Sequence, residues 1–440
     1  MPESRMIHLA ADISFAHTDL RWALPGSWQG YRYYGPEFYQ DLARIASRGK
    51  FDMLFFGDAA ETPENHGGSY ESAVRLGYRW PKHDMSTMIP LMAQAAEGVG
   101  FGLTMNTTYL HPFHVARLMS SLDWVTGGRV GWNSVTGAYK NEAANWGYDE
   151  LPDPAERYRK AREHMEVVFG LWDTVEADAI LLDRENTRFG DPSKVHLLNH
   201  EGEFFKVRGP LPAMPSPQGR PVIIQAGMSP DGMDLAATFA DMQFTARKTL
   251  ESMGQHRTTL DGLLVEKGRS PRDLGCWWAV NVIVDESKSA AREKRRRMSE
   301  MLGAEFGLML LSAQFGIDFG AVNPKWKLSE VADAVQNQKV HWGSFAEIIA
   351  TTDPEMTVEQ YAIERIIAEP LVLGSPSDVA DRLEELHEAS DENGGFILAP
   401  GYIMPDHLRD FVELVVPELQ RRGRVKTEYA GTTLRSNLNA

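Results

Sequence analysis

The sequence predicts an α/β protein, a (β/α)8 TIM barrel with long insertions at the C-terminal mouth of its strands. Short β-rich runs alternate with longer helical patterns, which is typical of helices that cross over between parallel strands. Eight such runs are present, enough to close a barrel. The 440 residues exceed one ordinary core of roughly 100–200 residues but fit one enlarged barrel, so we expect residues 1–440 to form a single domain.

The predicted strands are mostly continuous apolar runs, as expected where both faces of a strand are covered. They are Met6–Ser14, Phe51–Gly57, Val99–Asn106, Arg129–Val135, Pro221–Ala226, Met242–Ala246, Trp277–Val284 and Gly395–Ala399. The helical patterns between them are Pro36–Arg48, Thr87–Glu97, Pro112–Val125, Pro154–Trp172, Asp231–Phe239, Leu250–Lys267, Ser287–Leu302, Ser377–Ala389 and Asp406–Arg422.

Several connections are much longer than the usual βα loop of roughly 2–6 residues, and we interpret them as insertions. In a TIM barrel the loops after the strand C-termini build the active site. We expect Gly303–Pro370 to contain helices of its own and to form a lid or wall. The polar tail Arg424–Ala440 keeps Tyr429 and Leu434 and is therefore expected to dock. The insertions are 15–35, 58–86, 136–153, 175–220 and 303–370.

Composition excludes several classes of protein. With 61 acidic and 45 basic residues the net charge is −16, which repels phosphate backbones and anionic headgroups, so no nucleic-acid partner is expected. No run approaches the roughly 20 apolar residues that span a bilayer, so no membrane association is expected. The single Cys276 cannot form an internal disulfide, and the first 24 residues lack an apolar signal core. A cytoplasmic location is predicted.

Two motifs have structural interpretations. The run Gly98–Gly102 (GVGFG) leads into a strand instead of opening a helix, which favours close packing at a strand start over a dinucleotide loop. The pairs His111/His114 and His196/His200 lack the adjacent glutamate or third ligand of a zinc motif, which favours helix-start and surface histidines.

Polar residues follow four of the predicted strands, and barrel geometry would bring them to one mouth. The segment with Gly227 and Ser229 directly precedes a helix, where free backbone N–H groups and the helix dipole suit a phosphate. Each residue alone could equally be a cap or turn former, so their joint placement is what indicates a site. The set comprises Asp58, Asn106 to Thr108, Asn133 to Thr136, and Gln225 to Ser229.

Several segments closely resemble one enzyme family, in the same order and over nearly the whole chain. It is the bacterial-luciferase-like flavin-dependent monooxygenases, which include nitrilotriacetate, dibenzothiophene-sulfone and long-chain alkane monooxygenases. The segments include RGKFDMLFFGD (48–58), LTMNTTYLHPFHVARLMSSLDWVTGGRVGWNSVTG (103–137), ERY (156–158), SPQGRPVIIQAGMSP (216–230) and GGFILAP (394–400).

The resemblance implies a two-component monooxygenase. Reduced FMN would come from a separate NAD(P)H-dependent flavin reductase and would react with dioxygen to oxygenate a small organic substrate. Many relatives have a histidine where this chain has Pro154, so one polar contact near the flavin is lost or replaced. A homo-oligomer, dimer or tetramer, is also expected. Carried over by position, the FMN contacts are Asp58, Asn106, Asn133, Thr136 and Tyr158, with Ala226, Gly227, Met228 and Ser229 on the phosphate side; the candidate catalytic residue, as a substrate contact, is His111.

The substrate class and three alternative functions stay open. The long loops are rich in aromatic residues, which either frame a pocket for an aromatic or heterocyclic ligand or pack the loops onto the barrel. The alternatives are a deazaflavin-dependent dehydrogenase on the same fold, a metal-dependent barrel hydrolase, and a non-catalytic flavin-binding relative. The aromatic loop residues are Trp22, Trp28, Tyr31, Tyr33, Tyr34, Trp80 and Tyr109, with His83 beside them.

Overall fold

The computed structural model describes most of the chain. Within the insertion expected at 15–35 it describes only part, and Trp28, Tyr31 and Tyr33 lie outside the described residues. Residues 336–351 of the insertion expected at 303–370 also lie outside. The described residues are 5–14, 18, 21–25, 27, 32, 34–247, 249–335, 352–353, 355–367, 371–399 and 405–439.

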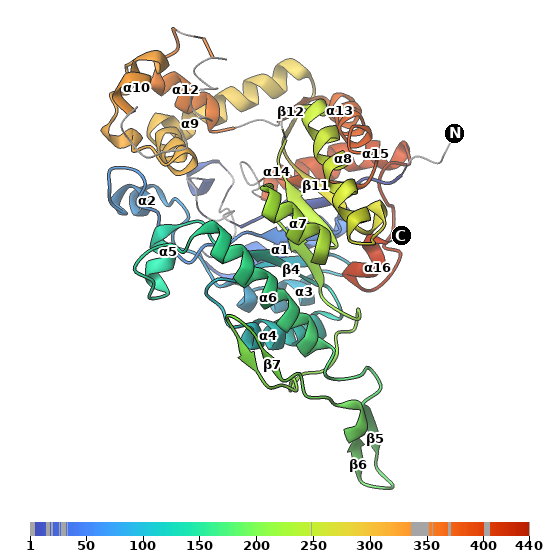
Figure 1. Cartoon of the computed structure of the whole chain (residues 1–440). Coiled ribbons are helices and arrows are strands. Elements are labelled where there is room, and N and C mark those ends of the chain that lie inside the picture. Colours follow the sequence, from blue (N-terminus) through green and yellow to red (C-terminus); the bar gives the residue numbers. More distant parts are fainter. Residues whose placement is uncertain are drawn as a thin grey trace.

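Eight parallel strands close into a barrel, which confirms the predicted fold class (Figure 1). The strand order around the barrel is β1-β2-β3-β4-β9-β10-β11-β13, and β13 pairs with β1 to close it. All eight predicted strands are present, with ends that shift by a few residues. They are β1 His8–Asp12, β2 Met53–Phe56, β3 Gly100–Asn106, β4 Val130–Val135, β9 Val222–Gln225, β10 Met242–Thr245, β11 Gly275–Val284 and β13 Gly394–Leu398.

Helices lie between successive strands and cover the outside of the barrel. A large buried cluster packs the outward strand residues, such as Leu54 and Phe101, against helix residues such as Leu42 and Met119. None of the helices in the described part of the chain is both long and apolar enough to span a membrane. The helices that cover the barrel are α1 Pro36–Arg48, α3 Ile89–Ala95, α4 Pro112–Thr126, α6 Pro154–Trp172, α7 Pro230–Phe239, α8 Leu250–Glu266, α9 Lys288–Phe315, α13 Pro376–Glu388, α14 Pro405–Asp410, a π-helical turn Phe411–Val415 and α15 Val416–Arg421.

The insertions contain short elements of their own. Figure 1 shows α10 and α12 grouped with α9 on one side of the barrel, beside α2, and the β5–β6 hairpin extending away from it. The elements are α2 Glu71–Leu76, α5 Lys140–Asn145, β5 Ile180–Asp183, β6 Arg188–Gly190, β7 His200–Glu201, β8 Lys206–Val207, α10 Leu328–Val335, α12 Val358–Arg365 and β12 Leu371–Gly374.

One boundary near the 303–370 insertion agrees with the prediction and one strand there was not expected. The helix expected to end at Leu302 is interrupted at Gly303, whose φ of 79° and ψ of 165° are not helical, and a second helical segment follows to Phe315; both segments carry the label α9. Glycine tolerates this backbone, so the chain changes direction at this residue. The strand β12 was not predicted, and it extends the sheet by pairing with the second half of β11.

The C-terminal tail seals the amino-terminal end of the barrel, as expected from its apolar residues. Leu434, in α16 Leu434–Leu438, is fully buried with Ala10 and Met53 inside the barrel. Arg435 forms two hydrogen bonds of 2.7 and 2.9 Å with the Asp241 carboxylate.

The glycine-rich run packs against this tail, which confirms the structural interpretation of the motif. A Cβ at Gly98 would lie 2.1 Å from the Tyr429 ring, and a Cβ at Gly100 would lie 2.7 Å from Leu434 Cδ1. Tyr429 Oη donates to the Phe51 carbonyl at 2.9 Å. The small residues therefore admit the tail and leave no loop for a dinucleotide.

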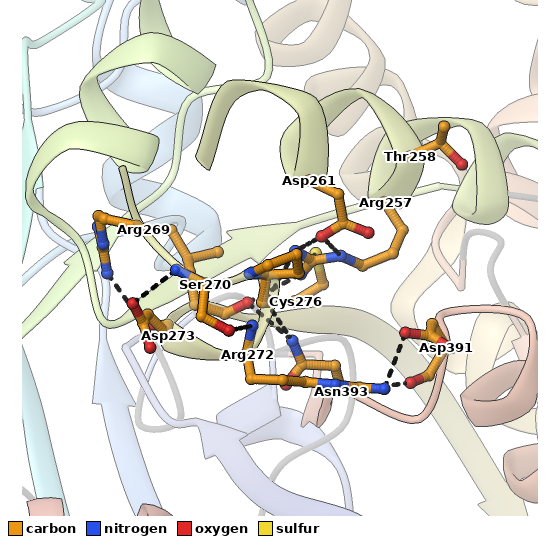
Figure 2. Close-up of polar contacts among 12 residues, drawn as sticks. Arg257, Thr258, Asp261, Arg269, Ser270, Arg272, Asp273, Cys276, Asp391 and Asn393 are labelled. Carbon is orange, nitrogen blue, oxygen red and sulfur yellow. Dashed lines mark hydrogen bonds and ion pairs between the residues drawn. The ribbon is translucent and has the colours of Figure 1, made fainter. Parts of the chain in front are cut away.

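A buried arginine fixes the start of β11 (Figure 2). Arg257 of α8 donates to the Leu274 carbonyl and to Asp261 Oδ1, both at 2.8 Å, and its Nη1 lies 3.5 Å from Cys276 Sγ. Asn393, just before β13, donates to the same Leu274 carbonyl at 3.1 Å. Burial raises the pKa of the Cys276 thiol to about 11, so this cysteine is a packed, unreactive side chain.

The sealing role of the tail predicts a large effect of Leu434→Ala. Removing a fully buried leucine side chain leaves a cavity in the barrel core and should lower the free energy of unfolding by about 2–5 kcal/mol, measured by urea denaturation. The matched control is Leu197→Ala, because Leu197 is 47% exposed and its loss should change stability by less than about 0.5 kcal/mol. Equal effects of the two substitutions would show that the tail does not seal the core.

Candidate active site

A cavity of about 680 Å³ opens at the carboxyl ends of the barrel strands. Its size lies within the roughly 300–1,000 Å³ of pockets that enclose small molecules. Every barrel strand contributes a lining residue or is followed by one, in strand order Asp12, Phe55, Thr104, Asn133, Ala226, Phe244, Asn281 and Ala399. The floor of the cavity is therefore fixed by the barrel.

Three of the long insertions form the outer wall of the cavity. The 58–86 segment contributes Tyr78 and Arg79, and the 136–153 segment contributes Tyr139. The 303–370 segment contributes residues of α9 and the end of α12, namely Phe306, Leu310, Ala313, Gln314, Arg365 and Ile366. The described residues of α9 and α12 in the 303–370 segment therefore form part of the cavity wall.

Contacts between the insertions hold the wall together. His66 Nδ1 lies 3.1 Å from Ser312 Oγ in α9, and the Gly67 amide donates to Asp318 Oδ1 at 2.8 Å. Arg75 of α2 forms a two-pronged ion pair with Glu305 of α9. Because these bonds join separate segments, the 58–86 loop and the α9 wall are expected to move together.

Asp58 opens into the cavity and pairs with a lysine. Its Oδ1 lies 3.5 Å from Lys82 Nζ, and the lysine also donates to the Ala59 carbonyl. Burial among the surrounding loops raises the pKa of Asp58, with Lys82 acting in the opposite direction. About a third of the side chain is accessible, and the residue lines the cavity. Asp58 thus offers a polar contact to a ligand in the cavity.

Asn133 has a buried acceptor that no protein group satisfies. Its Nδ2 donates to Thr104 Oγ1 at 2.8 Å, whereas its Oδ1 has no hydrogen-bond partner although the residue is only 2% exposed. Leaving a buried acceptor unpaired costs about 1–3 kcal/mol. Since Asn133 lines the cavity, a bound ligand with an N–H or O–H group would relieve this cost.

The loop between β9 and α7 is held by side chains on both sides. The Gly227 amide donates to Gln225 Oε1 at 2.7 Å, and the Gly227 carbonyl accepts from Gln243 Nε2 at 2.8 Å. Ser229 caps α7 by accepting from the Gly232 amide at 3.2 Å, and its Oγ lies 3.0 Å from Tyr158 Oη. The residues expected on the phosphate side are thus neighbours at one helix start.

A hydrogen-bond chain extends behind this loop. His256 Nε2 lies 2.8 Å from Gln243 Oε1, and Arg247 Nη2 lies 3.1 Å from His256 Nδ1. An arginine only donates, so His256 Nδ1 accepts and Nε2 carries the proton that Gln243 Oε1 receives. Burial, with the nearby Arg247 and Arg257, lowers the pKa of His256 to about 4 and keeps it neutral. The chain therefore orients the Gln243 amide toward Gly227.

Six of the nine expected FMN contacts do not line the cavity, namely Asn106, Thr136, Tyr158, Gly227, Met228 and Ser229. Asn106 accepts from the Thr108 amide at 2.8 Å and donates to Glu142 at 3.4 Å. The Thr136 carbonyl accepts from Thr108 Oγ1 at 2.8 Å, and the Met228 side chain is exposed. Asn106 and Thr136 thus brace the loops behind the cavity, because these hydrogen bonds join them to other protein groups.

His111 caps a helix and lies outside the cavity lining. Its Nδ1 accepts from the Phe113 amide at 3.3 Å at the start of α4, and its ring contacts Phe205 edge-on. Burial lowers its pKa. The structure therefore gives this candidate catalytic residue a capping role, which was the plainer of its two interpretations.

The histidines of the other pair, His196 and His200, each contact a different glutamate. His196 lies 2.9 Å from Glu176, and His200 lies 2.9 Å from Glu163. Among the described residues no group of three or more His, Cys, Asp and Glu side chains could hold a metal.

Three of the described aromatic loop residues pack the loops together, whereas Trp80 is 40% exposed. Tyr34 stacks on His83 with ring centroids 3.6 Å apart, and Tyr109 stacks on Trp146 at 6.1 Å. Trp22 donates to the Leu76 carbonyl at 3.2 Å. The aromatic side chains that do line the cavity are Phe55, Tyr78, Tyr139, Phe244 and Phe306, which the sequence analysis did not single out for the site.

A TIM barrel with a partly polar cavity at the carboxyl ends of its strands has the architecture of a barrel enzyme. The chain belongs to the luciferase-like monooxygenases, because the model of that family matches residues 21–393. The resemblance inferred from the sequence motifs is thereby confirmed, and the protein is an oxidoreductase of this family.

Similar proteins agree with this membership. Nitrilotriacetate monooxygenase component A from Aminobacter aminovorans is 37% identical over 95% of this chain and 92% of its own length. The crystal structure of DmoA from Hyphomicrobium sulfonivorans superposes with a TM-score of 0.89, 34% identity, and coverage of 99% and 92% of the two chains. A riboflavin lyase, RcaE, solved with modified FMN and riboflavin, superposes with a TM-score of 0.84 at 25% identity, covering 99% and 96%.

The hydrogen-bond chain of Arg247, His256 and Gln243 behind the β9–α7 loop predicts an effect of pH on stability. The pKa of His256 is about 4 in the folded protein, below the unfolded value near 6.5, so the unfolded state binds the proton more readily. Stability from neutral His256 is present above about pH 6.5 and is lost as the pH falls toward 4. Between pH 7 and pH 5 the wild type should lose about 1–2 kcal/mol more than His256→Gln, whose amide can still donate to Gln243. Identical pH profiles in urea denaturation would contradict the assignment.

Proposed function

We propose that the protein is the oxygenating component of a two-component FMN-dependent monooxygenase, which inserts oxygen into a small organic substrate held in the mouth cavity. The observation that carries this proposal is the unpaired Oδ1 of Asn133 in the wall of the cavity. Membership of the luciferase-like family supports the use of a reduced flavin. Because a flavin ring bears an N–H group beside its carbonyls, the donor and acceptor of Asn133 suit it.

The residues present fit a mononucleotide. We assign Asp58 and Asn133 to the ring, since both line the cavity. Ala226, which the family resemblance places on the phosphate side, also lines the cavity and is therefore assigned to the ring. Tyr158, Gly227, Met228 and Ser229 are assigned to the phosphate side, where hydroxyl groups and the start of a ten-residue helix gather. Asn106 and Thr136 support these contacts from behind the cavity wall.

The protein supplies orientation and shielding to this reaction. Reduced FMN, when bound, supplies the chemistry that activates dioxygen, so the site needs no catalytic triad of its own. The barrel floor fixes the position of the ring, and the walls from 58–86 and 303–370 limit water around it. Asp58 and Lys82 place a polar pair at the edge of the cavity.

A separate reductase accounts for the supply of reduced flavin. The glycine-rich run at Gly98–Gly102 is packed against the tail and so cannot serve as a dinucleotide loop. The name of the Aminobacter relative, component A, supports a system in which another polypeptide carries out flavin reduction.

The phosphate assignment predicts that Ser229→Ala weakens FMN binding more than riboflavin binding. A hydrogen bond to phosphate is charge-assisted, so the dissociation constant for reduced FMN should rise about tenfold or more, with a smaller change for riboflavin, in anaerobic fluorescence titrations. Ser287→Ala, which removes the N-cap of α9, controls for helix capping and should leave both affinities unchanged. Equal losses for the two flavins would place Ser229 away from the phosphate.

The two-component proposal predicts no turnover by this chain with NADH, oxygen and substrate alone. Activity should appear on addition of FMN and a flavin reductase, and substrate-dependent oxygen uptake should accompany product formation. Sustained NADH oxidation by the isolated chain would contradict the proposal. Product formed without oxygen uptake would instead support a deazaflavin-type dehydrogenase, and flavin binding without any turnover would support a non-catalytic relative.

A further inference from the structure

One arginine in the cavity wall has no described counter-charge. Arg365 is the last residue of α12 and lines the cavity beside Ile366. Its Nε is buried without a hydrogen-bond partner, and no ion pair joins Arg365 to any described carboxylate. Among the described residues, the guanidinium has one cation–π contact, with the Tyr361 ring, whose centroid lies 6.0 Å from the guanidinium carbon.

The other charges of the cavity are already engaged with protein groups. Asp58 pairs with Lys82 at 3.5 Å, and Asp12 accepts from the Ser14 amide at 3.0 Å. Arg79 donates to Tyr139 Oη at 3.1 Å and stacks on Tyr78. A partly buried guanidinium is costly without an anion, because desolvation is not repaid by a partner. The positive charge at the end of α12 is therefore available to a ligand.

The surface around Arg365 is mostly apolar. Phe306, Leu310 and Ala313 of α9 line the cavity with Ile366, and Gln314 adds an amide to the same wall. An anion-binding group next to an apolar wall suits a molecule with a hydrocarbon or aromatic body and one acidic end. Arginine binds the planar or trigonal oxygens of carboxylate and sulfonate groups through two parallel N–H donors.

We propose that the substrate is an organic anion whose carboxylate or sulfonate group binds Arg365, with its apolar body against the α9 wall. This inference rests on the proposed function, since it names the substrate class of that site. Arg365 comes from the 303–370 insertion, whereas the residues assigned to the flavin come from the barrel strands, the loops that follow them and the start of α6. The cofactor and the charged end of the substrate therefore bind to different parts of the fold.

The test compares anions with neutral molecules of the same shape. The probes are benzenesulfonate with benzenesulfonamide, and hexanoate with hexanamide, titrated by calorimetry into the full-length protein with and without reduced FMN under anaerobic conditions. The wild type should bind each anion about tenfold or more tightly than its neutral partner. Arg365→Gln should abolish the preference, and Arg365→Lys should keep part of it. Arg297→Gln, an exposed arginine of α9 that pairs with Glu293, is the control and should behave as the wild type.

Each result decides the proposal. A wild-type protein that binds neither anion, or binds anions and neutral partners equally, would overturn it, as would a preference that survives in Arg365→Gln. A loss of FMN affinity without a loss of riboflavin affinity in Arg365→Gln would show that the arginine holds the cofactor phosphate instead, which also overturns it. Failure of the wild type to bind reduced FMN would contradict the proposed function separately, since anion preference is also measured without flavin.

Discussion

Closure of the eight parallel strands is the constraint on which the other features depend. Because β13 pairs with β1, no strand of the barrel has an open edge, and all carboxyl ends point to the same mouth. One polar side chain at each of several strand ends therefore becomes a lining for one cavity. The opposite end is left open by the same geometry, and the C-terminal tail fills it with Leu434. The site can carry an unpaired acceptor such as Asn133 because the sealed barrel beneath it is stable without that contact.

The sequence predicted the barrel well because most of its strands are continuous apolar runs. Such a run can be recognised from neighbouring residues alone, without knowledge of contacts far along the chain. Of the residues that it placed at the mouth, Asp58, Asn133 and Ala226 line the cavity, because they lie in or directly after strands that the fold brings together. The residues of the cavity wall could not be predicted, since no period or spacing in the sequence relates Phe306 and Arg365 to strands far away along the chain. The role of His111 was ambiguous for a local reason. A histidine before a helix-start proline can cap the helix or face a ligand, and the same sequence pattern is compatible with both roles.

The loop that follows β9 shows how positions near the mouth are fixed without direct contact to the cavity. Gly227 has no side chain, so its backbone approaches Gly232 closely; a Cβ there would lie 2.9 Å from the Gly232 Cα. Its amide and carbonyl are both bound by glutamine side chains, and His256 orients one of those glutamines. The sequence marks Gly227 and Gln225 but not Gln243 or His256, because these two residues meet the loop only through the register of β10 and the packing of α8 on the barrel.

The pairing of β1 with β13 also governs how the chain reaches its native state. His8 lies opposite Gly395, and Leu434 packs on Ala10 and Met53, so the barrel interior is completed only by contacts between residues several hundred positions apart. Such contacts require the closure of very long loops before any stabilisation is gained, which slows folding. Until they form, β1 exposes an unpaired edge that other chains can bind. The feature that makes the finished barrel rigid thus makes its unfinished form prone to aggregation during synthesis.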